Sequence, residues 1–161
     1  MGSKAGIPVL VIDILKGYLA VTLISLFPVF SSTSTQFLYV QLGLGLAALL
    51  GHLFPLFAQF KGGKGVATLL GVTLAIQPLP TLCAIGIFLI VLLISHYVSL
   101  SSISAAISFP IFVTWGFSQV HNIIIIFALI IATAVIITHR KNIIRLFQKK
   151  ESRVYLFSKK R

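Results

Sequence analysis

Acidic side chains are nearly absent from this sequence. Only Asp13 and Glu151 carry a carboxylate, against thirteen Lys and Arg in 161 residues, and the formal net charge is +11. Carboxylate-rich metal sites are therefore excluded, and with them enzymes such as the CDP-alcohol phosphotransferases, which bind metal ions through several aspartates. The one cysteine, Cys83, lies in an apolar run, so neither a disulfide nor a cysteine-based metal site can form within one chain.

Charged residues of either sign are also scarce. They make up 9% of the chain, whereas soluble domains contain about 25%, and 58% of the residues are hydrophobic. A soluble chain of this size still exposes roughly a third of its unfolded surface, so it could not hide this much apolar surface from water. We therefore expect lipid to be the solvent for most of the chain. We expect no nucleic-acid partner, because there is no soluble basic face.

Six apolar segments organise the chain. The first two are long enough to cross a bilayer, which takes about 20 helical residues. Pro78 and Pro80 interrupt the stretch from residue 66 to residue 94, which is then either one kinked helix or two short ones. The six segments are residues 7–30, 37–57, 66–76, 79–94, 103–117 and 123–138.

The basic residues decide between these alternatives. They mark the cytoplasmic side of a membrane protein, and they also suit an anionic substrate or lipid; both readings can hold together. With six spans all thirteen lie on one side, whereas a single kinked helix would put the nine C-terminal ones opposite. The sequence therefore predicts an all-α polytopic membrane protein with six transmembrane helices, two of them short and joined at Gln77 to Pro80. Both termini are then cytoplasmic, and we expect one integral-membrane domain over residues 1–148 with a basic tail over residues 149–161.

Two features bear on helix packing. The segment 66–76 reaches only about 18 Å as a helix, short of the ~30 Å hydrocarbon core, so we expect it inside the bundle. Gly43, Ala47 and Gly51 recur every four residues on one helix face. Small residues at this spacing predict a close approach to another helix.

The stretch KGGKG, between the second and third apolar segments, predicts an anion site. Glycines let a backbone turn tightly and direct successive N–H groups to one place. The helix that starts near Val66 adds its positive end, and Lys61 and Lys64 add full charges. A nucleotide P-loop is excluded, because it needs Ser or Thr where Gly65 stands. The alternative is a flexible cytoplasmic turn, but three glycines in four positions exceed what such a turn needs.

A second candidate site is THRKNIIRL, at the end of the last apolar segment. If the helix continues, His139, Asn142 and Arg145 lie toward one side of it. A histidine, an amide and a guanidinium can grip a phosphoryl oxyanion. The alternative is anchoring at the membrane interface by basic side chains, and the residues alone leave it at least as probable.

Near the N-terminus, Asp13 and Lys16 share a helix face inside an apolar span. Ionisable groups at such depth face each other or a cavity. Either they form an ion pair that fixes the helix, or Lys16 adds positive field to a polar cavity. His52 precedes the glycine stretch and is a candidate supporting residue.

Four motifs, DILKG, GHLFPLFAQFKGGKGVAT, YVSLSS and HRKNIIRL, in this order, resemble the acyl-phosphate-dependent glycerol-3-phosphate acyltransferases of bacteria, the PlsY family. The similarity runs from Gly2 almost to the C-terminus. That family has seven transmembrane helices and transfers a fatty acyl group from acyl phosphate to the 1-hydroxyl of sn-glycerol 3-phosphate. The resemblance implies formation of lysophosphatidic acid and phosphate in phospholipid biosynthesis, in the bacterial inner membrane, with the active site on the cytoplasmic side.

The resemblance also implies roles for individual residues. The reaction of this family needs no metal or cofactor. It needs no nucleophilic Ser or Cys either, because phosphate is a good leaving group and phosphoryl oxygens of the acyl phosphate can take the hydroxyl proton. The implied catalytic residues are Lys64, His139 and Asn142. The implied phosphate and substrate contacts are Lys61, Gly62, Gly63, Gly65, Thr68 and Arg145, supported by His52, Asp13 and Lys16.

Two departures from the family pattern stand out. The family's first helix and its first motif, a Gly-Ser-x-Asn loop ending in arginine, have no counterpart here, and the segment GSKAG resembles the family's residues just after that arginine. The third motif commonly reads HRENI, and Lys141 replaces the Glu. The alternatives are therefore a truncated fragment that binds phosphate or lipid without turnover, and an anion transporter. We expect a monomer whose other partners are membrane lipids and the soluble enzyme that forms acyl phosphate.

Overall fold

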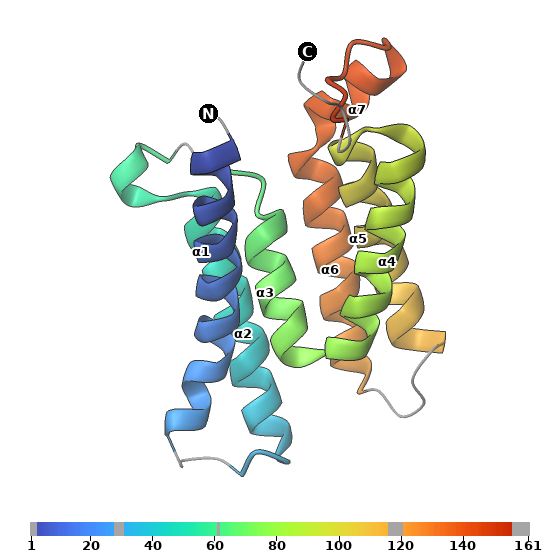
Figure 1. Ribbon diagram of the computed structural model, residues 1–161. Helices are drawn as coiled ribbons and strands as arrows, with labels where there is room; N and C mark the ends of the chain where they lie inside the picture. The colour runs from blue at the N-terminus through green and yellow to red at the C-terminus, as the bar shows by residue number, and fades with distance from the viewer. Residues whose placement is uncertain (1–2, 28–30, 61, 116–120, 156–161) are drawn as a thin grey trace. The chain divides into compact units, whose positions relative to one another are not determined.

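The computed structural model describes residues 3–27, 31–60, 62–115 and 121–155, which are helical with short connections (Figure 1). Within these ranges there is no β-strand. The α-helices and 3₁₀ turns are α1 (Ser3–Thr22), η1 (Leu23–Leu26), α2 (Thr35–Leu53), η2 (Leu56–Ala58), α3 (Val66–Ile76), α4 (Pro78–Ser95), α5 (Val98–Trp115), α6 (Asn122–Thr138) and α7 (Arg140–Phe147).

The six predicted apolar segments correspond to α1 through α6. Four of them, α1, α2, α4 and α5, are long and apolar enough to cross a membrane, and α6 with α7 forms a fifth candidate span that is bent by 59°. At 11 residues α3 is shorter than a span. Large apolar side chains such as Ile7, Ile12 and Leu19 are more than half exposed, as expected of a surface that faces lipid. The chain is thus an all-α polytopic membrane protein.

The predicted break between the third and fourth segments lies at Gln77. Its backbone has left the helical region (φ −138°, ψ 73°), and the helical conformation is disfavoured for the residue before a proline. Pro78 then begins α4, where its missing N–H costs no helical hydrogen bond.

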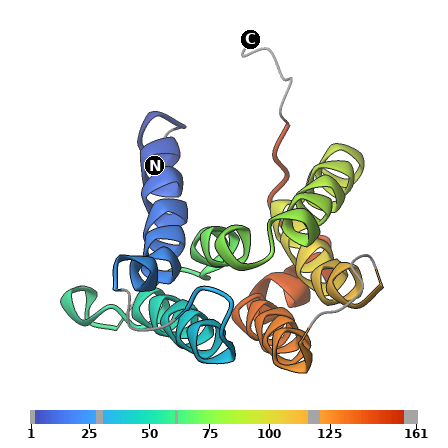
Figure 2. The same cartoon turned by 90° about the horizontal axis from the view of Figure 1, so that it is seen from below.

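The described chain forms two compact units, residues 1–78 and residues 79–161. In the first unit, α1 lies against α2 and α3 (Figure 2). The contact of α1 with α3 is very close: a Cβ added at Gly17 would collide with the carbonyl oxygen of Thr68, and one added at Gly71 with that of Ile14. Glycine is therefore required at both positions by backbone proximity.

The predicted packing role of Gly43 and Gly51 is wrong for this unit. No described atom lies within 4 Å of a Cβ added at either position, and both residues, like Ala47, are exposed. Spacing alone identifies a helix face, but it does not say whether that face meets a helix or lipid.

In the second unit, α5 packs against α6. Buried apolar side chains from both helices form its core, among them Val113 on α5 and Phe127, Ala128 and Ile131 on α6. The bend at His139 turns α7 away from the axis of α6, and α7 itself lies against α5. The unit therefore places a short helix, α7, at the end where the chain leaves α6.

Candidate active site

The glycine stretch is a packed loop whose shape depends on its glycines. A Cβ added at Gly62 would collide with the carbonyl oxygens of His52 and Leu53, and one added at Gly63 would run into the His52 ring. Gly65 has φ +80°, in the left-handed region that glycine occupies without strain. A flexible turn would not require glycine at these positions, so the structure favours a loop with one specific, closely packed conformation. Lys61 lies outside the described residues.

The first turn of α3 has no side-chain cap at its N-terminus. Gly65 is the N-cap residue, and it supplies no side-chain acceptor to the first turn. The first N–H groups of a helix have no intrahelical partner, and they carry its positive partial charge. In the same turn Thr68 is fully buried, and its Oγ1 makes no hydrogen bond within the described part of the chain. Lys64 is exposed and adds a positive charge beside this turn.

Three ionisable side chains, two from α1 and one from α2, lie close together. Lys16 Nζ lies 2.6 Å from Asp13 Oδ1 and 2.6 Å from His52 Nδ1. Asp13 Oδ1 is 3.5 Å from His52 Nδ1. The predicted ion pair between Asp13 and Lys16 therefore exists, and His52 extends it to α2.

His139 lies at the junction of α6 and α7, so the helix does not continue through it as the sequence suggested. Its backbone N–H still bonds to α6, and its carbonyl accepts the N–H of Asn142 in α7 at 2.8 Å. The side chain is 2% exposed. Its Nδ1 donates to the carbonyl oxygen of Val135 at 2.8 Å, because a carbonyl can only accept. In the neutral imidazole Nε2 is then the acceptor.

Asn142 is held by a buried carboxylate. Its Nδ2 donates to Glu151 Oε1 at 2.6 Å, and Ser99 Oγ donates to the same oxygen at 2.9 Å. Arg145 Nε lies 3.0 Å from Glu151 Oε2. Since the carboxylate accepts the amide N–H, the Asn142 Oδ1 is turned away from it as an acceptor.

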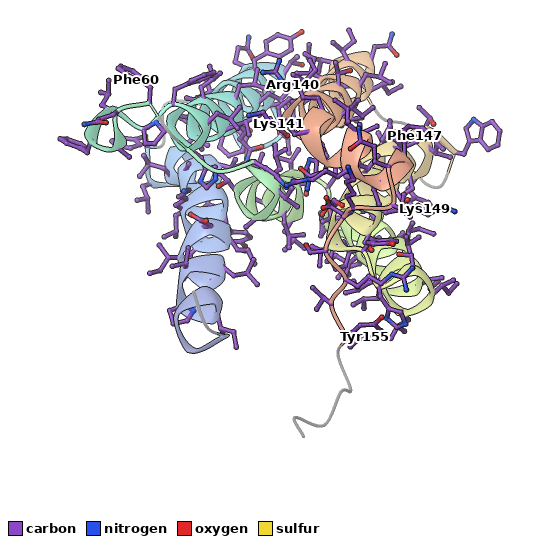
Figure 3. The ribbon with its side chains drawn as sticks, turned by 90° about the horizontal axis from the view of Figure 1, so that it is seen from above. Phe60, Arg140, Lys141, Phe147, Lys149 and Tyr155 are labelled. Atoms are coloured by element: carbon purple, nitrogen blue, oxygen red, sulfur yellow. The ribbon has the colours of Figure 1, made fainter. Side chains whose placement is uncertain are left out.

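Glu151 reaches Asn142 because the chain reverses after α7. Lys149 is left-handed (φ 55°), its N–H bonds to the Leu146 carbonyl, and the Lys150 N–H bonds to the Arg145 carbonyl. These two bonds form a Schellman turn, which usually has glycine at the left-handed position. Figure 3 shows Lys149 at this turn and Tyr155 in the segment beyond it.

The segment after Glu151 packs on the turn between α4 and α5. Val154 N–H donates to the His96 carbonyl at 2.8 Å, and the rings of His96 and Tyr155 lie 4.9 Å apart. Arg153 Nε donates to the Tyr97 hydroxyl at 3.0 Å, and this bond raises the pKa of Arg153. The first tail residues thus belong structurally to the second unit.

The sequence-predicted residues fall into two groups. Asp13, Lys16, His52 and residues 62–68 lie in the first unit, whereas His139, Asn142 and Arg145 lie in the second. Sequence reasoning missed Glu151 and Ser99. Glu151 had a usable signal, since it is one of two acidic residues and would be costly to bury without partners. No cluster of three or more His, Cys, Asp or Glu that could hold a metal ion occurs in the ranges described.

These features define a class: a polytopic membrane protein with a glycine loop at one helix start and a buried His–Asn–Glu group at another. Comparison with known proteins gives the family. The family model described as glycerol-3-phosphate acyltransferase matches residues 1–149, and the chain belongs to that family.

Relatives and solved structures agree with this assignment. The glycerol-3-phosphate acyltransferase of Chlorobium phaeobacteroides strain BS1 is 36% identical over 96% of this chain and 77% of its own length. The glycerol-3-phosphate acyltransferase of Endomicrobium trichonymphae is 40% identical over 99% of this chain and 76% of its own length. The crystal structure of PlsY (YgiH), an integral membrane glycerol 3-phosphate acyltransferase, in its glycerol 3-phosphate form matches with a TM-score of 0.82 and 37% identity, covering 98% of this chain and 77% of that one. The lysophosphatidic acid form matches with a TM-score of 0.81. The predicted family and membrane class are confirmed.

Proposed function

We propose that this chain transfers an acyl group from an acyl phosphate to the 1-hydroxyl of sn-glycerol 3-phosphate. The products are lysophosphatidic acid and inorganic phosphate. The observation that carries the proposal is the glycine loop at the start of α3, in a chain of the glycerol-3-phosphate acyltransferase family. Both substrates carry phosphate. A helix N-terminus with glycine as its N-cap residue and a lysine beside it can bind phosphate through its backbone N–H groups and the positive charge of the lysine.

The glycine loop of the first unit holds a phosphoryl group. Lys64 supplies the positive charge, and the backbone N–H groups after Gly65 supply donors. Gly62, Gly63 and Gly65 cannot carry a side chain without collision or strain, so the loop backbone is closely packed against α2, which favours one shape with and without ligand. A preorganised set of donors stabilises developing negative charge better than water, which must reorient.

The His139 and Asn142 side chains of the second unit bind the acceptor alcohol. His139 and Asn142 are both nearly buried, and each is oriented by a hydrogen bond to a fixed partner, the Val135 carbonyl and Glu151 respectively. His139 Nε2 and Asn142 Oδ1 are acceptors in this arrangement and suit the hydroxyl groups of glycerol 3-phosphate. Arg145, about half exposed, supplies charge for the phosphate of that substrate.

In the proposed reaction the 1-hydroxyl oxygen attacks the acyl carbonyl carbon. The new ester C–O bond forms, the C–O bond to phosphate breaks, and the hydroxyl proton passes to a phosphoryl oxygen. The leaving phosphate therefore takes the proton, and no carboxylate base is needed. The protein contributes position and charge stabilisation.

The same proposal covers the setting of the enzyme. Thirteen basic residues against two acidic ones support a bacterial inner-membrane location with site and termini cytoplasmic. A cytoplasmic site can receive acyl phosphate from a soluble enzyme, and we propose a monomer as the active form. A single domain over residues 1–148 stays a prediction.

Substitution of Lys64 tests the phosphate assignment. The full chain is purified in detergent and assayed with palmitoyl phosphate and glycerol 3-phosphate. Lys64→Ala should lower kcat/KM by about tenfold or more, because it removes a charge-assisted contact with phosphate. Lys150→Ala, which removes an exposed lysine outside the site, should leave the rate within about twofold. An unchanged rate in Lys64→Ala would refute the assignment. Phosphate binding without any turnover would instead favour the non-catalytic alternative.

A further inference from the structure

The tautomer of His52 is set by its contact with Lys16. An ammonium group has only hydrogen-bond donors, and Lys16 Nζ lies 2.6 Å from His52 Nδ1, so Nδ1 must be the acceptor. Asp13 Oδ1 lies 2.6 Å from the same Nζ, so the ammonium group also donates to this carboxylate. The imidazole proton is therefore on Nε2, at the opposite edge of the ring.

That opposite edge faces the glycine loop. A Cβ added at Gly63 would overlap His52 Nε2 before any other described atom, so the ring edge lies directly against the backbone of Gly63. The preceding residue, Gly62, packs on the carbonyl oxygen of His52 itself. The histidine therefore contacts the loop with both its backbone and its ring, and only 14% of its side chain is exposed.

We propose that His52 is a positioning residue for the anion loop. The Asp13–Lys16 pair fixes the orientation of its ring and the Nε2–H tautomer, and the ring edge packed against Gly63 holds the loop backbone in its anion-binding shape. The identity of the anion rests on the proposed function, whereas the fixed tautomer and its contact with the loop do not. The Asp13–Lys16 ion pair of α1 then does more than orient a helix, because its contact with His52 of α2 links it to the loop.

Nitrogen-15 NMR of histidine-labelled full chain in detergent tests the tautomer without any enzyme assay. His52→Gln identifies the His52 signals by their loss. We expect an unprotonated Nδ1 and a protonated Nε2 in the unmodified chain at neutral pH, and a mixture of tautomers in Lys16→Met. A proton on Nδ1, or an unchanged spectrum in Lys16→Met, would overturn the proposal.

Two substitutions of His52 separate positioning from simple space filling. Glutamine places an amide nitrogen near the position of Nε2, whereas asparagine reaches only the position of Nδ1. With inorganic phosphate as a competitive inhibitor of acyl transfer, we expect His52→Asn to raise the inhibition constant about tenfold or more, and His52→Gln to stay within about threefold. Equal effects of the two variants would contradict the positioning role.

Glycine substitutions provide a matched control. Gly63→Ala should displace the ring and alter the His52 signals, whereas Gly43→Ala, on the same helix as His52 but with open space at its added Cβ, should leave them unchanged. If the chain proves to have no acyltransferase activity, the NMR result still decides the tautomer. Failure of the proposed function and failure of this inference are thus distinguishable.

Discussion

Removal of the Glu151 carboxylate should destabilise the second unit and release Asn142. The side chain is 7% exposed and accepts bonds from Asn142 and Ser99, each of which is 5% exposed. In Glu151→Ala both donors lose their acceptor, and each buried unsatisfied group costs about 1–3 kcal/mol. The Arg145 contact adds little, about 0–1 kcal/mol, because that side chain is half exposed. The total is a loss of about 2–7 kcal/mol.

Glu151→Gln should cost much less. One amide oxygen can still accept from Asn142 and Ser99, although neutral hydrogen bonds are roughly half as strong as charge-assisted ones. The amide nitrogen then meets the donor Nε of Arg145 and loses that contact. We expect a loss of about 1–2 kcal/mol in stability, with partial retention of activity.

Thermal unfolding in one detergent, followed alongside kcat/KM, measures both effects. Gln148→Ala serves as control, because Gln148 is an exposed residue of the same segment. Ala and Gln substitutions of Glu151 with the same small effect would refute the inference that this carboxylate holds Asn142.

Two further substitutions test the backbone geometry. Gly71→Ala should lower stability by about 1–3 kcal/mol, because the new methyl group meets the Ile14 carbonyl and overpacks the contact of α1 with α3, whereas Gly43→Ala should be neutral or slightly stabilising. Thermal unfolding that ranks these two equally would contradict the close approach. Lys149→Gly should stabilise the chain by about 1 kcal/mol, because it relieves a left-handed conformation in a non-glycine residue, and a measured loss would argue against the Schellman turn.

The helices and their main break were predictable because both depend on local sequence. Long apolar runs specify spanning helices, and the residue before Pro78 is pushed out of the helical region by the proline ring. The loop before α3 was predictable for the same reason, since the three glycines and the helix after them are contiguous, and its role as an anion site stays a prediction.

The rest depends on contacts between distant residues. The bond from Asn142 to Glu151 needs a chain reversal at Lys149, a residue whose type gives no sign of a left-handed backbone. The close helix contact uses Gly17 and Gly71 from different helices, which no single-helix spacing rule can pair. The bend at His139 likewise could not be predicted, because no proline or glycine lies beside it in the sequence.

A comparison of two acyl donors tests the central claim most directly. The purified full chain is given glycerol 3-phosphate with either palmitoyl phosphate or palmitoyl-CoA, and lysophosphatidic acid and inorganic phosphate are both quantified. We predict one phosphate released for each lysophosphatidic acid formed from palmitoyl phosphate, and no product from palmitoyl-CoA. Product formation from palmitoyl-CoA would contradict the account. So would the absence of product from palmitoyl phosphate, if a thermal unfolding transition shows that the chain is folded.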